Sequence, residues 1–266
     1  MNGLKQLQAE EVPKMSIVVP TLNEEENIRF LLESIKDQSY VSFETLIIDG
    51  GSKDKTQLIA CHYNAKVVVL PGHGEFISRN IGAKMARGNF LLFACADIVF
   101  PKNTFQRVVE EFEKRPELIA LTGPGYHFDA SFVGRLEHVT FDFIRYFFSK
   151  FPKPLKRFPT STNFLVVRKS YFDKTGGFAV DDINADGLIG KELLDMGAVA
   201  FFPDIYIYAS ARRMKDMGFF AFHKHYLYAL ENFFYFFSNK SVLKSWKLQA
   251  RKRHGKMHEI QRAPRF

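Results

Sequence analysis

The sequence contains few cysteines and no apolar leader. Its 266 residues include two cysteines, Cys61 and Cys95, both in apolar or helical surroundings. So few thiols argue against a disulfide framework and indicate a reduced, intracellular protein. The first 14 residues, MNGLKQLQAEEVPK, have no apolar run of the kind found in signal peptides. We therefore expect a cytoplasmic protein.

The sequence also lacks a convincing membrane span. The best candidate, residues 219–237, reads FFAFHKHYLYALENFFYFF and includes Lys224 and Glu231. A charged side chain at the centre of a span costs roughly 2.5–3.5 kcal/mol, so we expect this segment not to cross a bilayer. Its dense aromatic residues have two alternative roles. They pack on the rest of the protein or on another subunit, or they lie on a membrane surface.

Most of the chain carries no formal net charge, and the excess of basic residues lies at its end. Residues 239–266 hold nine of the 37 Lys and Arg but one of the 29 Asp and Glu, so the first 238 residues carry 28 of each. A basic tail can contact nucleic-acid phosphates, but no base-reading motif accompanies it, and we expect no specific nucleic-acid partner. Contact with anionic lipid through residues 219–266 is the alternative, at ~1 kcal/mol per basic residue near the surface. This would make the protein a peripheral one on the cytoplasmic membrane face.

Strand-like and helix-like segments alternate from Met15 onward. SIVVP and FLLFA are short apolar runs, typical of parallel strands covered on both faces. Asn23 stands three residues before Glu26, and this capping-box spacing predicts a helix opening at Asn23. The alternation predicts an α/β fold with a mostly parallel, Rossmann-like sheet flanked by helices.

The same pattern divides the chain into three parts. We expect an N-terminal extension over residues 1–14, a single α/β domain over 15–213, and an aromatic, then basic, helical tail over 214–266. Residues 126–158 are rich in Phe and Arg and are predicted to form an insertion that carries an aromatic helix.

Polar groups follow three of the predicted strands, in PTLNE, DGGSKD and ADI. Ligands of open α/β sheets bind beyond the carboxyl ends of the strands, so these groups are candidates for a binding site. Asp49 is followed by two glycines, which let a ligand approach the backbone; a helix-capping turn is the alternative. Asp97 is either a ligand residue or a surface residue just past its strand. No GxGxxG or Walker lysine motif is present, which argues against dinucleotide-binding and P-loop proteins.

Five motifs occur in a specific order: SIVVPTLNEEENI, LIIDGGSKDKT, SRNIGAKMARGNFLLFACAD, TNFLVVRKSYFDKTGGF and SARR. Together they resemble the family-2 glycosyltransferases of the GT-A fold, over roughly residues 15–213. The resemblance implies a metal-dependent enzyme that transfers a sugar from a nucleoside-diphosphate sugar, with GDP or UDP as carrier, to an acceptor with inversion of configuration. The base, the sugar and the acceptor stay open, and some relatives of this fold retain configuration.

The resemblance also implies a set of donor-binding residues. The first loop cradles the base, Asp49 binds the base or ribose, and Arg79 helps to hold the nucleotide. The two arginines of SARR suit a departing diphosphate because guanidinium groups bind phosphate oxygens bidentately, although one of the pair is compatible with a surface position. The expected donor-site residues are Pro20, Thr21, Leu22, Asn23, Glu24, Asp49, Gly50, Arg79, Asp97, Arg212 and Arg213.

The family's metal-binding Asp-X-Asp signature is incomplete in this chain, where it reads Cys95-Ala96-Asp97. Asp97 matches the second aspartate and is the expected ligand of Mg²⁺ or Mn²⁺. One carboxylate suffices when substrate phosphates and waters complete the coordination, and a thiol such as Cys95 is a poor ligand for a hard cation. His223 or His225 is a candidate for a further ligand; a surface histidine pair is the alternative.

On the acceptor side, the resemblance identifies Asp186 as the general base that removes a proton from the acceptor hydroxyl. Ala185 stands where the family usually has another acid, and Asp181 and Asp182 lie near enough to be confused with Asp186. Capping of the helix that it begins is the alternative role. A lipid-linked acceptor such as a polyprenyl phosphate would already be anionic and would need no base.

Two other classes of function compete with the enzyme. The missing first aspartate and Ala185 are compatible with a non-catalytic relative that binds a nucleotide sugar or serves as a scaffold. The basic tail alone is compatible with a nucleic-acid binder.

Overall fold

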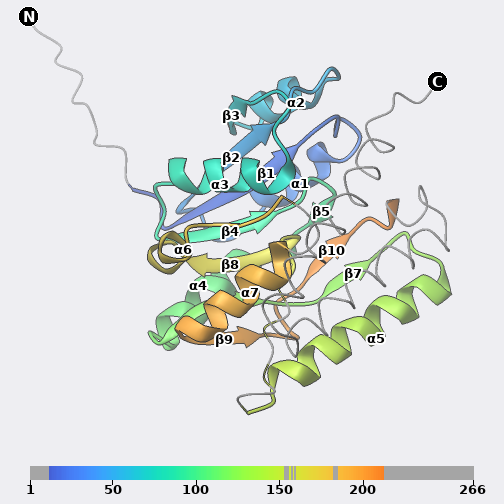
Figure 1. The fold of residues 1–266 in the computed structure, drawn as a ribbon. Helices are drawn as coiled ribbons and strands as arrows, with labels where there is room; N and C mark the ends of the chain where they lie inside the picture. Colours follow the sequence, from blue (N-terminus) through green and yellow to red (C-terminus); the bar gives the residue numbers. More distant parts are fainter. Residues whose placement is uncertain (1–11, 153–155, 157, 159, 182–184, 213–266) are drawn as a thin grey trace, which may run out of the picture.

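The computed structural model describes residues 12–152, 156, 158, 160–181 and 185–212. In this part of the chain, a seven-stranded sheet lies between two layers of helices, and a small three-stranded sheet joins it to a long helix, α5 (Figure 1). The predicted α/β class with helices flanking a mostly parallel sheet is confirmed.

The strands and helices follow one another along the chain in the predicted alternation. The strands are β1 (Met15–Thr21), β2 (Phe43–Asp49), β3 (Lys66–Val69), β4 (Phe90–Ala94), β5 (Ile98–Val99), β6 (Leu118–Thr122), β7 (Gly125–His127), β8 (Phe164–Arg168), β9 (Ala198–Phe201) and β10 (Ile207–Ala209). The helices are α1 (Ile28–Lys36), α2 (Thr56–His62), α3 (Glu75–Met85), α4 (Thr104–Lys114), α5 (Phe132–Ser149), α6 (Lys169–Thr175) and α7 (Ala185–Met196).

The large sheet has the order β3-β2-β1-β4-β8-β6-β9. Its strands are parallel except for β8, which runs antiparallel to both β4 and β6. The chain leaves β1 toward β2 and β3 on one side and returns to β4 on the other. The carboxyl ends of β1 and β4 therefore form a topological switch point, where ligands of such sheets usually bind.

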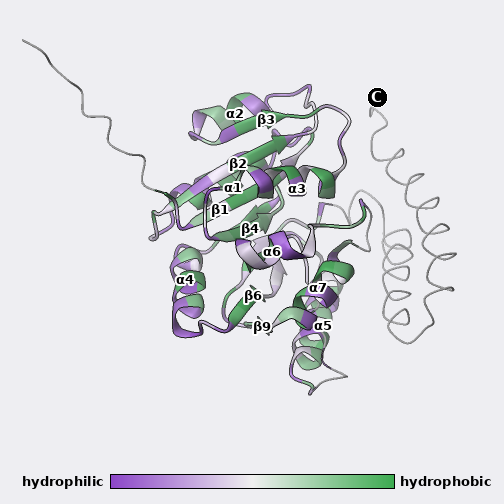
Figure 2. Cartoon of the chain, turned by 60° about the vertical axis from the view of Figure 1, so that its left-hand side comes forward, coloured by the Kyte–Doolittle hydropathy of each residue, from purple (hydrophilic) through white to green (hydrophobic). Residues whose placement is uncertain are grey.

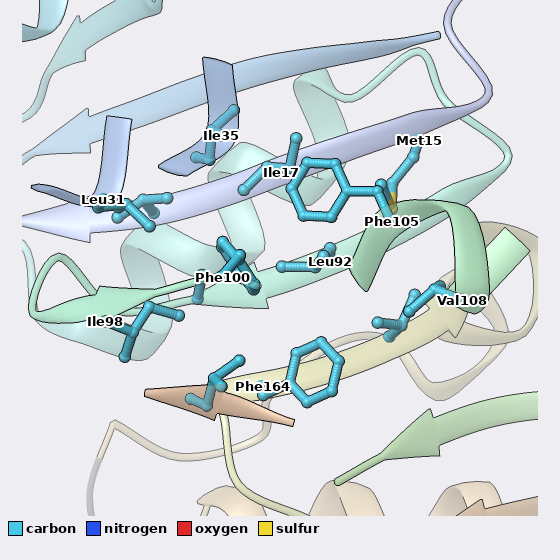
Figure 3. Packing of buried hydrophobic residues seen from close by; sticks show 14 of the residues in the cluster. Met15, Ile17, Leu31, Ile35, Leu92, Ile98, Phe100, Phe105, Val108 and Phe164 are labelled. Atoms are coloured by element: carbon cyan, nitrogen blue, oxygen red, sulfur yellow. The ribbon is translucent and has the colours of Figure 1, made fainter. Parts of the chain in front are cut away.

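The core has two halves because successive residues of a strand point to opposite faces of the sheet. In β1, Ile17 and Val19 pack with α1 and α4 on one face, as Figure 3 shows for Ile17, and Val18 packs with α3 and α7 on the other. Figure 2 shows the central strands coloured mainly as hydrophobic, as both halves of this core require. The core thus fixes the two central strands whose carboxyl ends form the switch point.

The sequence prediction of one helix start is wrong. Helix α1 begins at Ile28, and Asn23 has a left-handed backbone with φ 54° and no capping role. Its Oδ1 instead accepts a hydrogen bond from Lys53 N at 2.9 Å, so a tertiary contact replaces the expected cap. Helix α3 ends at Met85, before Gly88, where a Cβ would lie 2.7 Å from the Met15 carbonyl carbon.

The predicted insertion contains α5, as expected, together with most of β7, which begins one residue earlier at Gly125. Strand β10 joins β5 and β7, pairing antiparallel with β5 and parallel with β7, in a small sheet that sequence periodicity did not reveal. Strands of two or three residues are too short to show an alternating pattern. Helix α5 packs on β7 and β9.

The C-terminal tail, residues 214–266, lies outside the described residues, as do Arg213 and the histidines His223 and His225. The three-part division of the chain stays a prediction. Among the residues that the structure describes, no helix combines the length and the apolar composition needed to cross a bilayer.

Candidate functional site

Asp49 holds together the loops that follow β1 and β2. It is fully buried, and its Oδ1 accepts hydrogen bonds from Gly51 N at 3.0 Å, Ser52 N at 2.7 Å and Gln57 Nε2 at 2.8 Å. Its Oδ2 accepts from Thr21 Oγ1 at 2.9 Å. Burial raises the pKa of Asp49, but the hydrogen bonds from Ser52, Thr21 and Gln57 outweigh it, and the net pKa lies below its ordinary value. The carboxylate is ionised and shapes the loop; its contact with a nucleotide base or ribose stays a prediction.

The first loop is fastened to the second along its length. Asn23 N donates to Ser52 Oγ at 2.8 Å, and Gly50 N donates to the Thr21 carbonyl at 2.8 Å. Leu22 is exposed between these contacts, whereas Pro20, in β1, is half-buried. The predicted base-binding residues of the two loops therefore lie together at the carboxyl ends of β1 and β2.

Arg79 is the largest fully buried polar side chain beside the switch point. From α3 it donates to the Ala94 carbonyl at 2.9 Å, to Glu75 Oε1 at 2.8 Å and to Cys95 Sγ at 3.3 Å. Its Nε has no hydrogen-bond partner among the described residues. Desolvation lowers the pKa of Arg79, but Cys95, Glu75 and Asp186 raise it by more. The net pKa lies above its ordinary value, so the guanidinium is charged.

Cys95 stands between two elements of the site. Its Sγ donates to Asn163 Oδ1 at 3.0 Å and accepts from Arg79. Asn163 precedes β8, and the antiparallel pairing of Phe164 with Ala94 brings the start of β8 to the end of β4. Sequence analysis did not identify Asn163, because only the direction of β8 places it here.

Asp97 lies half-buried in the turn between β4 and β5. Its carbonyl accepts a hydrogen bond from Ser210 N at 2.9 Å, which brings it beside the segment that leads to Arg212. In the described part of the chain, no three His, Cys, Asp or Glu side chains gather as a metal site. Metal binding by Asp97 therefore stays a prediction that depends on further ligands from the substrate.

Asp186 lies in the first turn of α7, and its Oδ1 is buried without a hydrogen-bond partner in the described chain. Burial raises the pKa of Asp186 to about 6, although Arg79 opposes the shift; Glu75 adds to it, and hydrogen bonds from Thr162 reduce it. A carboxylate with this pKa can take up and release a proton near neutral pH. The hydrogen bonds from Thr162 are a further contact that sequence analysis did not identify.

Asp181 has a separate structural role. Its Oδ1 accepts a hydrogen bond from Phe76 N at 2.8 Å in the first turn of α3. Its other oxygen occupies the place that a Cβ at Gly74 would need. Asp181 is thus the cap of α3, and Asp182 lies outside the described residues.

Arg212 reaches the first loop from the far end of the described chain. Its Nη2 donates to Glu24 Oε1 at 2.8 Å, and both side chains are half-buried. Arg212 N also donates to Ser210 Oγ at 3.1 Å, which fixes the backbone after β10. The predicted diphosphate-binding arginine therefore lies next to the predicted base-binding loop.

Comparison with known proteins identifies the family. A family model described as Glycosyl transferase family 2 matches residues 16–176, which is more than half of the chain. The chain belongs to glycosyltransferase family 2. The match includes both loops, Arg79, Cys95, Asp97 and all of β8; it ends before Asp186 and Arg212.

Individual relatives of this family cover only parts of the chain. An uncharacterised glycosyltransferase of Haemophilus influenzae is 32% identical over 107 residues, 39% of this chain and 36% of that relative. The chain therefore spans little more than a third of the length of that relative.

Solved structures of glycosyltransferases share the fold. The mannosyltransferase PcManGT of Pyrobaculum calidifontis, in complex with GDP-Man and Mn²⁺, has a TM-score of 0.59 at 19% identity, covering 74% of this chain and 57% of that one. Residues 1–349 of Staphylococcus aureus TarS, in complex with UDP-GlcNAc, also have a TM-score of 0.59, at 21% identity, covering 75% and 59%. These likenesses confirm the expected GT-A fold for this family-2 chain.

Proposed function

We propose that this chain is a metal-dependent glycosyltransferase that moves a sugar from a GDP- or UDP-sugar to an acceptor with inversion. The observation that carries the proposal is the pair of buried polar atoms left without partners at the switch point, Arg79 Nε and Asp186 Oδ1. Buried polar groups are normally hydrogen-bonded, so an orphan donor and an orphan acceptor in one cluster indicate a ligand with hydroxyl groups. A sugar next to the metal-motif turn supplies such groups.

The donor would bind across the loops that Asp49 organises. Residues Pro20–Glu24 and Gly50 would hold the base and ribose, and Arg79 would help to hold the nucleotide. Arg212, with Arg213, would bind the diphosphate. The structural neighbours PcManGT and TarS, whose structures hold GDP-Man and UDP-GlcNAc, support either base as the carrier.

The residues present fit a divalent cation that is completed by the donor. Asp97 offers one carboxylate, and Mg²⁺ commonly binds one or two carboxylates together with substrate phosphates and waters. Cys95 would not compete, because Asn163 and Arg79 already contact its sulfur. When bound, the cation would neutralise charge that develops on the leaving diphosphate.

Asp186 would act as the general base. In a single displacement, the acceptor oxygen attacks the anomeric carbon as the bond to the diphosphate breaks, and the proton of the acceptor passes to the carboxylate. The released nucleoside diphosphate carries the negative charge, next to Arg212. For the acceptor we propose a lipid-linked class, with membrane contact through residues 219–266; an acceptor phosphate would bypass the base.

Calorimetric titration with GDP and UDP, each with Mn²⁺ and with EDTA, tests the donor site. We expect tight, metal-dependent binding of one nucleotide and its loss in Asp97→Asn. Asp37→Asn, at the exposed carboxyl end of α1, is the matched control and should bind normally. Binding that ignores both the metal and Asp97 would refute the assignment.

A non-catalytic relative is the second candidate, supported by Cys95 at the first metal-motif position. Slow release of nucleoside diphosphate from the bound donor, measured without acceptor, separates the two. Release that depends on Asp186 and Mn²⁺ supports the enzyme, whereas tight donor binding without release supports the binding protein.

A further inference from the structure

Helix α5 exposes large apolar side chains on one side and buries three polar side chains on the other. Its buried side chains are those of Asp142, Arg145 and Ser149. Arg145 and Asp142 form an ion pair at 2.7 Å, and Asp142 Oδ2 accepts from Gly125 N at 3.1 Å. These contacts attach the inner side of α5 to β7 and leave its other side outward.

The outward side, the α5 outer face, consists of large apolar side chains that are each at least 45% exposed: Phe132, Val133, Leu136, Val139, Phe143, Ile144 and Phe147. Their spacing of three and four residues places them on one side of the helix. Single exposed apolar residues are ordinary, but a contiguous set indicates an interaction surface.

Basic residues flank one end of this face. Lys150, which is exposed, follows the helix directly, and the next residues of the sequence are FPKPLKRFPT, which include three more basic residues and no acid. An apolar helix face beside Lys and Arg is the pattern of helices that lie in the interface of an anionic membrane. A surface for a second protein would not need this one-sided positive charge.

We propose that the α5 outer face docks on an anionic lipid surface, with its apolar side chains in the interface and Lys150 at the headgroups. The inner ion pair keeps the helix attached to β7, so α5 would lie along the surface. This contact is distinct from the contact expected of residues 219–266. It does not depend on the proposed activity, and its test uses no nucleotide.

The first experiment reports the position of the helix directly. The chain has one tryptophan, Trp246, so the Trp246→Phe variant has no tryptophan fluorescence of its own. In that background we place a tryptophan by Phe143→Trp on α5 or, as a control, by Phe30→Trp at an equally exposed site on α1. With vesicles of phosphatidylglycerol and phosphatidylcholine, the α5 emission should shift to the blue and the α1 emission should not.

The second experiment measures affinity by vesicle sedimentation of the full chain. Combined Phe132→Ser, Phe143→Ser and Phe147→Ser should lower the partition coefficient about tenfold or more, since apolar burial drives interfacial binding. The matched control is Phe30→Ser, Val41→Ser and Leu58→Ser, which removes exposed apolar side chains from the opposite part of the fold and should bind as before.

Three results would overturn the proposal. Vesicle binding without an α5 emission shift would assign the contact to the tail alone. A change from dimer to monomer in the α5 triple variant, by light scattering, would assign the face to a second copy of the chain. A new protease cleavage within residues 213–266 of that variant, without vesicles, would show that the tail covers the face.

Discussion

Arg212 donates a hydrogen bond to Glu24 at 2.8 Å, although 188 residues separate them in the sequence. This pair joins the loop after the first strand to the last residue that the structure describes. Arg212 is therefore held in place before any ligand binds, which suits a group that must meet a diphosphate in a fixed position.

Replacing Arg212 with methionine should weaken nucleoside diphosphate binding about tenfold, because a hydrogen bond to a charged group contributes about 1.5–3 kcal/mol. Nucleoside monophosphate binding should change much less. Calorimetry of both ligands checks this, with Arg107→Met, a surface ion-pair residue, as the control. Equal losses for both ligands would place Arg212 at the base or ribose instead.

Cys95→Asp should strengthen metal binding in the nucleotide complex about tenfold, since it adds a carboxylate to the metal-motif turn beside Asp97. Arg79, 3.3 Å from the sulfur, would stabilise the added charge. Titration of Mn²⁺ into the protein with saturating nucleotide measures the effect. Cys95→Ser is the control of similar size and should leave the affinity near that of the natural chain.

Turnover with a hydroxyl acceptor should rise with pH through about 6, where Asp186 becomes ionised. Asp186→Asn should lower turnover about a hundredfold or more, remove this rise and leave donor binding intact. Asp195→Asn, exposed on the same helix, should retain both the rate and the profile. A flat profile in the natural chain would instead show that Asp186 is not the base that takes the acceptor proton.

The Asp186→Asn substitution should also stabilise the fold in a pH-dependent way. The folded pKa of Asp186 lies above its usual value of 3.8, so the fold favours the protonated form. The cost of the ionised form is absent below about pH 4 and complete above about pH 6, where it reaches about 3 kcal/mol. Urea unfolding should show Asp186→Asn more stable than the natural chain at pH 8 and nearly equal at pH 4.

His127 should make the fold sensitive to acid. Burial lowers the pKa of His127 to about 4. His138, whose ring is stacked with a centroid distance of 3.6 Å, adds to this shift, and Asp129 opposes it. His127 therefore takes up a proton near pH 6.5 in the unfolded chain but only near pH 4 in the folded chain. This difference removes about 3 kcal/mol of stability across that window. His127→Gln should reduce the loss, measured by urea unfolding at pH 7 and pH 4.5.

Sequence patterns predicted the elements that continuous apolar runs define, including β2, which ends at Asp49, and β4, which Cys95 follows. They failed where tertiary contacts decide the outcome. Asn23 contacts the neighbouring loop instead of capping a helix, and β5 and β7 are too short for a pattern. Asn163 and Thr162 could not be assigned to the site, because only the reversed direction of β8 brings them to Cys95 and Asp186.

The reversed strand β8 also orders events during synthesis. Strand β4 is fully buried, and β8 pairs with it along its whole length. Until residue 168 has left the ribosome, β4 is an open apolar edge, the kind of edge that pairs with other chains. Truncated chains that end after β6 should therefore aggregate, whereas chains that extend through β8 have this edge covered.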